Sequence, residues 1–227
     1  MKMSVGPVFE PLPSRRAEIA PGFAVSRVLP QRARRTVGPW CFGDYYRAED
    51  AALDVLAHPH IGLQTVSWLF RGALDHVGGA LVRVVIGEAG AYRSPARTYS
   101  PATGLDVSSL RSGHVNVPLN PEHEHAVILV DGRASIADIP LQEATLYYLG
   151  LGRQSVEVGI EYGARLFVLG GAPFTERLVM WWNFVARSSN EIALARTDWT
   201  RRAFAPISGF EERRIDAPPL PPQIVAR

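Results

Sequence analysis

Residues 80–86 read A-L-V-R-V-V-I. This near-continuous run of apolar and β-branched side chains is the pattern of a strand that is buried on both faces. Further short apolar or alternating stretches follow it, separated by turn residues, at residues 97–100, 105–110, 114–119, 126–130, 134–136, 144–148, 155–160 and 164–169. Roughly eight strands with turns every 8–12 residues predict a complete β-sandwich or barrel, which we assign to residues 80–186.

The sequence after this domain predicts one helix over residues 187–203. Ser188 is followed three positions later by Glu191, which is the spacing of a capping box at a helix N-terminus. Three apolar side chains then share one helical face: Ile192, Ala195 and Trp199. We therefore expect an amphipathic helix that lies on the barrel.

Both ends of the chain are rich in proline. Residues 1–22 combine proline with charge and are predicted to form a loosely held arm. Residues 204–227 include A-P-P-L-P-P at 217–222. We predict a disordered tail there, and the alternative is a polyproline ligand for an aromatic groove.

The first half, residues 23–79, is too short for a closed barrel. It offers about four strands, among them residues 23–29, 65–70 and 73–77. A barrel of eight strands needs roughly 60–85 residues of economical chain, and parts of this region are not strand-like. A half-barrel must lean on the second domain, pair with another copy or stay partly disordered, because its edges and one apolar face are open. We expect association with a second copy or poor solubility.

Two histidines in the first half suggest a metal site. Residues 57–72 read A-H-P-H-I-G-L-Q-T-V-S-W-L-F-R-G, and on a strand His58 and His60 would lie on the same face. Two imidazoles on one face can provide two ligands of a metal ion. A metal that reacts with O₂ needs at least a third protein ligand. The candidates for it are His76 or Asp75 on the returning strand and, more weakly, Asp44 and Gln64. The alternative is a vestigial motif whose imidazoles face solvent or an incomplete cavity.

A second H-x-H motif, His123 and His125, enters the predicted strand at residues 126–130. Its spacing could hold a metal, but Pro121 and Glu122 place His123 in a loop, which argues against it. The isolated His114 is interpreted as a packed or surface residue.

Other reactive or aromatic residues have simpler explanations. Trp181 and Trp182 could stack on an aromatic ligand or a base, but core and inter-domain packing is the simpler explanation, because no basic patch surrounds them. Ser189 and Cys41 have no His/Asp partner at a suggestive spacing, so nucleophilic catalysis has no support.

Composition indicates an ordinary globular protein of 227 residues, of which 47% are apolar and 20% charged. A net charge of +2 is too small to predict a direct nucleic-acid partner, and the three arginines of residues 31–35 read as a solvated turn. The single cysteine, Cys41, favours a reducing compartment. The sequence shows neither an N-terminal signal-like run nor a stretch of ~18 apolar residues, so we expect a cytoplasmic protein with no membrane association.

Several motifs together resemble the pirin family. The first two are V-G-P-W-C-F-G-D at residues 37–44 and H-P-H-I-G-L-Q-T-V-S-W at 58–68. Downstream, in the same order as in bacterial pirin-like proteins, come V-V-I-G-E-A-G at 84–90, E-H-A-V-I-L-V-D-G at 124–132, Y-Y-L-G-L-G-R at 147–153 and M-W-W-N-F-V-A-R-S-S-N-E-I at 180–192.

The resemblance implies an all-β bicupin, meaning two jelly-roll (double-stranded β-helix) barrels in tandem, plus one C-terminal α-helix. Pirins hold iron in the N-terminal barrel through the two histidines of H-P-H and a later histidine and glutamate. Some members open the heterocycle of flavonols such as quercetin as dioxygenases, whereas others are regulatory cofactors. By this resemblance His58 and His60 would be ligands to Fe(II), and a flavonol would be the substrate.

This chain departs from the family pattern in its N-terminal barrel. After residues 75–79 it passes directly to residues 80–88, where the second barrel opens, and the later histidine and glutamate have no counterpart. Gln64 and Tyr45 also replace the family's usual glutamate and histidine. The expectation is therefore a bicupin with a truncated N-terminal barrel and at most weak quercetin 2,3-dioxygenase-type activity. The alternative is a catalytically silent cupin that binds a protein partner or a second copy through its intact second barrel.

Overall fold

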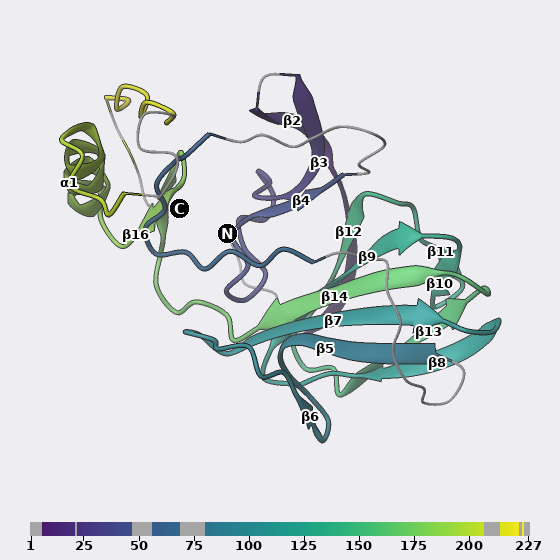
Figure 1. Cartoon of the computed structure of the whole chain (residues 1–227). Coiled ribbons are helices and arrows are strands. Elements are labelled where there is room, and N and C mark those ends of the chain that lie inside the picture. The colour runs from purple at the N-terminus through teal and green to yellow at the C-terminus, as the bar shows by residue number, and fades with distance from the viewer. Residues whose placement is uncertain are drawn as a thin grey trace. The chain divides into compact units, whose positions relative to one another are not determined.

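A computed structural model of the chain describes residues 6–20, 22–46, 56–68, 80–206, 214–222 and 224 (Figure 1). The chain forms two compact units. The first contains Met1–Glu18, Ala24–Arg47 and Trp68–Pro173, and the second contains Ile19–Phe23, Ala48–Ser67 and Phe174–Arg227. This division differs from the predicted boundaries, because most of residues 24–47 joins the downstream strands in one unit.

The first unit is built on two antiparallel sheets, and Figure 1 shows β14, β7 and β5 of the larger sheet side by side. The larger sheet has the order β1-β12-β9-β14-β7-β5-β6. Its strands are β1 (Pro7–Pro13), β12 (Thr145–Gly150), β9 (Glu124–Asp131), β14 (Arg165–Gly171), β7 (Ala102–Ser109), β5 (Ala80–Ala89) and β6 (Tyr92–Arg93). The smaller sheet is β11 (Ile139–Pro140), β10 (Ala134–Ile136), β13 (Ser155–Ile160) and β8 (Gly113–Pro118), in that order. The predicted all-β barrel is thus confirmed.

The main core fills the space between these two sheets. Because side chains alternate along a strand, every second residue of β9 points into it, including Val127 and Leu129. Val156 and Val158 of β13 meet them from the smaller sheet. This core defines the inner face of the larger sheet.

The outer face of the larger sheet is covered by the N-terminal part of the chain. Its buried cluster combines residues of the N-terminal segment with alternate residues of β9, β12 and β14, namely Leu12, Val28, Leu29, Val37, Ala126, Ile128, Leu146, Tyr148 and Leu169. Burial on both faces explains why β9 and β12 read as unbroken apolar runs. The sequence predicts that the shortened first half packs on the second domain, pairs with another copy or stays partly disordered. The residues of this cluster pack on the second domain.

The predicted N-terminal arm is wrong. Residues 7–13 form β1, which pairs antiparallel with β12, and Leu12 is buried. Residues 15–20 form β2 (Arg15–Ala20), in a three-stranded sheet with β3 (Phe23–Leu29) and β4 (Gly43–Tyr45). The proline-rich sequence concealed this because an edge strand tolerates proline where no ladder hydrogen bond is needed.

Two strand predictions also fail. Residues 97–100 lie in an irregular loop, and the strand starts only at Ala102. In the predicted strand at residues 65–70, residues 65–68 have no strand pairing, while residues 69–70 and 73–77 lie outside the described part of the chain.

The second unit contains the hairpin of β15 (Val179–Trp181) and β16 (Phe184–Ala186), followed by α1 (Ser189–Thr200). The predicted cap is confirmed, because the Ser188 side chain accepts a hydrogen bond from the backbone N–H of Glu191. The predicted buried face is also confirmed, with Ile192, Ala195 and Trp199 buried. Within its own unit, the helix packs against β15 and β16.

The C-terminal tail is more ordered than predicted. Ala217, Leu220 and Ile224 pack against the apolar cluster of the second unit. The indole N–H of Trp199 donates to the carbonyl of Ile215, and the Arg196 guanidinium donates to the carbonyl of Pro218. Tertiary contacts therefore hold a segment whose composition alone suggests disorder.

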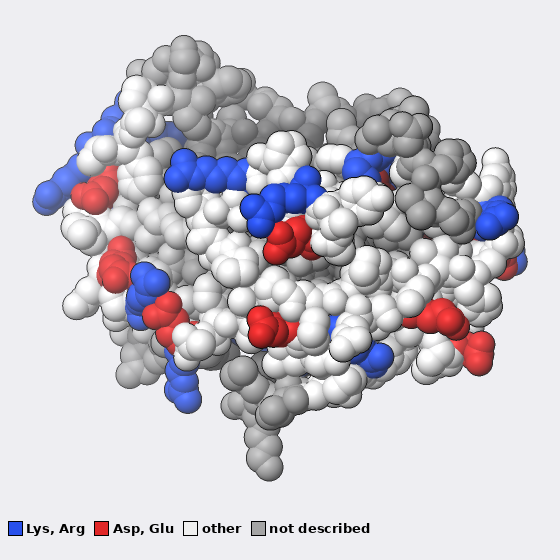
Figure 2. Space-filling model, turned by 90° about the horizontal axis from the view of Figure 1, so that it is seen from below, with Lys and Arg blue, Asp and Glu red and all other residues white. Residues whose placement is uncertain are grey.

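Charged side chains of both signs are dispersed among uncharged ones on the face shown in Figure 2. In the described part of the chain, no helix has the length and apolar character needed to cross a membrane.

Candidate functional site

The H-P-H motif lies between two backbone bridges rather than on a strand. Ala57 bridges to Arg214, and Ile61 bridges to Phe184 of β16. Residues 58–60 between them have no regular secondary structure, so the predicted strand geometry is wrong. The two imidazoles nevertheless meet, with ring centroids 4.9 Å apart and planes at 70°. The flanking bridges, not strand alternation, bring them together.

The spacing of these two rings is compatible with one metal ion. A metal about 2.1 Å from each ligating nitrogen lies roughly 3.2 Å from each ring centroid, so centroids 4.9 Å apart subtend about 100° at the metal. That angle falls between the octahedral and tetrahedral values. His58 and His60 therefore fit two adjacent positions of a coordination shell.

The protonation of both rings also suits metal binding. The Nδ1 atom of His58 lies 2.8 Å from the carbonyl oxygen of Leu56. A carbonyl can only accept, so we assign the proton to Nδ1, which leaves Nε2 as the free ligand atom. Burial and the neighbouring His58 lower the pKa of His60, against a smaller opposite effect of the Asn183 backbone. His60 is therefore neutral at pH 7.

The described residues do not complete the site. Among them, no group of three His, Cys, Asp or Glu side chains is placed to hold a metal. The predicted third ligands His76 and Asp75 lie outside the described residues. Asp44 is committed elsewhere, because both its carboxylate oxygens accept 2.6 Å hydrogen bonds from Arg27. Gln64 is exposed. A non-haem iron oxygenase needs a third protein ligand besides these two imidazoles.

The second H-x-H motif does not have the spacing of a metal pair. The ring centroids of His123 and His125 are 6.1 Å apart, which corresponds to roughly 145° at a shared metal. His125 is completely buried, and burial lowers its pKa to about 4. His123 is half-buried, and burial lowers its pKa as well. Both rings are thus neutral at pH 7, and they lie at one end of the barrel.

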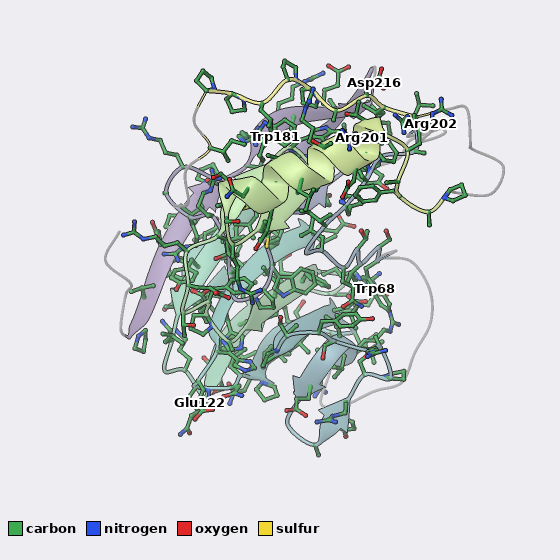
Figure 3. The ribbon with its side chains drawn as sticks, turned by 90° about the vertical axis from the view of Figure 1, so that its left-hand side faces the viewer. Trp68, Glu122, Trp181, Arg201, Arg202 and Asp216 are labelled. Carbon is green, nitrogen blue, oxygen red and sulfur yellow. The ribbon has the colours of Figure 1, made fainter. Side chains whose placement is uncertain are left out.

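The remaining candidates behave as structural residues. His114 is exposed and lies 3.4 Å from the Glu157 carboxylate. Burial raises the pKa of Cys41 to about 11, which keeps it a thiol at pH 7 and unsuited to act as a nucleophile. Ser189 begins α1. Trp181, labelled in Figure 3, and Trp182 pack with Phe184 in the core of the second unit, as the sequence suggests.

Sequence reasoning missed two buried acidic residues in the first unit. Asp106 accepts hydrogen bonds from Arg83, Arg165 and the indole of Trp68. Figure 3 labels Trp68. Glu124, the residue between His123 and His125, accepts from the backbone N–H of Gly38 and from the Tyr148 hydroxyl. The available signal was an acid inside an apolar strand, which predicts a buried partner.

A family model described as the Pirin C-terminal cupin domain matches residues 104–205. A crystal structure of quercetin 2,3-dioxygenase from Acinetobacter baumannii superposes with a TM-score of 0.89. It is 26% identical, and the match covers 96% of this chain and 97% of that one. The solved chain therefore has about the same length and architecture. The cupin fold follows from these two matches.

Two curated relatives match over most of the chain. A Pseudomonas aeruginosa protein provisionally named quercetin 2,3-dioxygenase is 28% identical over 286 positions, covering 94% of this chain and 91% of the relative. A Caulobacter vibrioides protein named pirin-like is 25% identical, covering 82% and 91%. Since 94% of 227 residues is about 213, roughly 70 positions of the first alignment hold residues of the relative with no counterpart here. Such unmatched residues in the relative are expected if the first half of this chain is shortened.

Proposed function

We propose that this chain, whose residues 104–205 match the Pirin C-terminal cupin domain, is at most a weak Fe(II)-dependent oxygenase of the quercetin 2,3-dioxygenase type. The observation that supports this is the His58–His60 pair, whose centroids are 4.9 Å apart and whose His60 ring is neutral at pH 7. The names of the P. aeruginosa and A. baumannii proteins agree with a flavonol as substrate.

The activity is proposed as weak because the described residues supply two ligands. Fe(II), when bound, would supply the redox chemistry between O₂ and the flavonol. The chain's own contribution would be to hold two imidazoles near each other, with the Leu56 carbonyl orienting His58. His76 remains the proposed third ligand.

Metal analysis combined with a quercetin assay tests this function. Purified protein is loaded with Fe(II) without oxygen, freed of excess metal, and exposed to quercetin in air. We expect iron to be retained, and quercetin absorbance to fall slowly. His58→Ala and His60→Ala should each abolish both signals, whereas His114→Ala, which changes an exposed histidine, should leave them unchanged. Iron well below one per chain with no loss of quercetin absorbance would rule out the enzyme.

A catalytically silent binding or regulatory protein is the second candidate. Two observations favour it. The described residues contain no complete group of metal ligands, and the second barrel is complete. In that case a second copy or a protein partner would bind the barrel, and light scattering after gel filtration would show whether the chain self-associates. His58→Ala would then change neither partner binding nor stability. We also propose a cytoplasmic location, since the chain has a single, buried cysteine.

A further inference from the structure

The proline-rich segment at residues 214–222 lies with one face on the second unit. A proline fixes its own φ and disfavours the helical region for the residue before it. The run A-P-P-L-P-P at 217–222 therefore favours a polyproline II helix, which has three residues per turn. Ala217 and Leu220, three positions apart, pack against the apolar cluster of this unit. Asp216, labelled in Figure 3, and the four prolines of the run are exposed. The burial thus has the period of polyproline II.

Two side chains of α1 bind the backbone of this segment. The indole N–H of Trp199 donates to the carbonyl of Ile215 at 2.9 Å. The Nε of Arg196 donates to the carbonyl of Pro218 at 2.7 Å. The two donors are three positions apart on the helix and share a face, and the two carbonyls are three positions apart, which is one turn of polyproline II. The spacing of the donors on α1 therefore matches the spacing of the acceptors on the segment.

Arg214, at the start of the segment, contacts α1 in two further ways. The central carbon of its guanidinium lies 4.5 Å from the centroid of the Trp199 ring. The same guanidinium donates to the backbone carbonyl of Trp199 at 3.0 Å. Trp199 itself is buried and packs edge-on against Phe204. The segment is thus bound to a tryptophan that the core of the unit holds in place.

The backbone N–H of Ile215 connects this segment to the H-P-H motif. It donates to the carbonyl of Ala57 at 2.8 Å, and Ala57 forms a parallel bridge with Arg214. Ala57 directly precedes His58, whose Nδ1 lies 2.8 Å from the carbonyl oxygen of Leu56. Ile215 therefore accepts from α1 with its carbonyl and donates to the residue before His58 with its N–H.

Backbone hydrogen bonds hold the H-P-H motif at both ends. Ala57 is bonded to the proline-rich segment at the first end, and at the other end the Ile61 carbonyl accepts from the N–H of Val185 in β16 at 3.1 Å. β16 lies within the residues 104–205 that match the cupin model, whereas Ile215 lies beyond them. Because residues 58–60 have no regular secondary structure, the places of the two imidazoles depend on both bonds.

We propose that residues 214–222 are a positioning element for the His58–His60 pair. They dock on α1 as a polyproline segment, and the docked segment fixes the backbone at Ala57. Arg196 and Trp199 are positioning residues, since they act on the imidazoles through Ile215 and Ala57. The consequence for metal binding rests on the proposed function, but the docking itself needs no iron.

Two substitutions at Ile215 test this in full-length, metal-free protein. Ile215→Pro removes the N–H that donates to Ala57 and keeps the extended backbone, whereas Ile215→Ala shortens the side chain and keeps the N–H. Long-range ¹H–¹⁵N spectra report the ring nitrogens of both imidazoles. In the wild type we expect His58 to carry its proton on Nδ1. Ile215→Pro should shift the ring resonances of His58 and mix its tautomers, and Ile215→Ala should leave them as in the wild type.

Substitutions at Arg196 test the helix side of the same connection. Arg196→Ala should shift the His58 resonances in the direction of Ile215→Pro, and Arg196→Lys, which keeps a cationic donor, should restore them in part. This pair decides the matter if circular dichroism shows that Ile215→Pro does not fold. The proposal is overturned if folded Ile215→Pro and Arg196→Ala both give the His58 and His60 spectra of the wild type.

Fe(II) affinity, measured without oxygen by competition with a chelator, gives a second readout. Ile215→Pro and Arg196→Ala should bind Fe(II) at least about tenfold more weakly than the wild type, which is the usual effect of losing a group that orients a ligand. Ile215→Ala should bind it normally. If the wild type itself binds no iron, the proposed function fails, and the metal-free spectra still decide whether the segment positions the imidazoles.

Discussion

The phenol of Tyr148 donates a 2.6 Å hydrogen bond to Oε2 of Glu124, inside the first unit. The other oxygen of Glu124 accepts from the backbone N–H of Gly38, 86 residues away in the sequence. The guanidinium of Arg34 stacks on the Tyr148 ring, with its central carbon 3.2 Å from the ring centroid. One buried carboxylate thus connects the N-terminal segment to β9 and β12. Burial, followed by the bond to Glu124, raises the pKa of Tyr148 well above its usual value.

Tyr148→Phe is expected to destabilise the protein by about 1.5–3 kcal/mol, because it removes a hydrogen bond to a buried charged group. Tyr45→Phe is the matched control, since the Tyr45 hydroxyl donates to a neutral acceptor, the carbonyl of Val130, at 3.0 Å. It should cost only about 0.5–1.5 kcal/mol. Urea denaturation of both variants measures the difference. Equal losses would show that Glu124 is protonated or satisfied in another way.

Asp106→Asn is expected to cost about 3–5 kcal/mol. It leaves the partly buried guanidinium groups of Arg83 and Arg165 without the buried carboxylate of Asp106, which is the costly way to break such an ion pair. The control is Glu88→Gln, whose carboxylate pairs with Arg93 on the surface. Exposed pairs contribute about 0–1 kcal/mol. The same urea assay compares them, and a loss at Asp106 no larger than at Glu88 would contradict the assigned burial.

Stability should fall in acid because of His125. Its pKa is lowered from 6.5 to about 4 in the folded state. Between these two pH values the unfolded state therefore binds a proton that the folded state does not bind. This contribution is complete above pH 6.5 and is lost as the pH falls toward 4, by about 3 kcal/mol in total. His125→Leu should remove that part of the slope, whereas His114→Ala should not. Urea midpoints between pH 4 and 7 measure it, and identical slopes would contradict the prediction.

Removal of residues 1–13 should expose the edge of β12 and promote association. It deletes β1, the stacking of Phe9 on Tyr147 at 5.3 Å, and the buried Leu12. We expect a loss of at least about 2 kcal/mol, since burial of one leucine alone contributes about 1.5–3 kcal/mol. An unpaired edge also recruits other chains. Light scattering should report larger species, whereas removal of residues 1–5 alone, which precede β1, should change little.

The strands and the helix could be predicted because their signals are local. Residues 134–136 and 155–160 are strands with the predicted bounds, and Ser188 caps α1 as its spacing with Glu191 indicates. The sequence did not predict β1 because proline hides an edge strand whose partner, β12, is distant in sequence. It did not predict β2, which lies beside β3 directly downstream, because its charged residues R-R-A-E-I-A resemble a solvated segment.

The candidate sites also combine features set by the local sequence with features set by tertiary contacts. The identity and spacing of His58 and His60, and the family they indicate, are properties of the linear sequence. Their meeting at 4.9 Å depends on bridges to Arg214 and Phe184, more than 120 residues downstream, which no local pattern encodes. The burial of His125 likewise depends on the pairing of β9 with β14, which places its ring against Gly170. Local periodicity determines which residues form strands. Burial and hydrogen-bond partners are decided only when distant segments pack, because only then do polar groups lose their water and either gain a protein partner or remain without one.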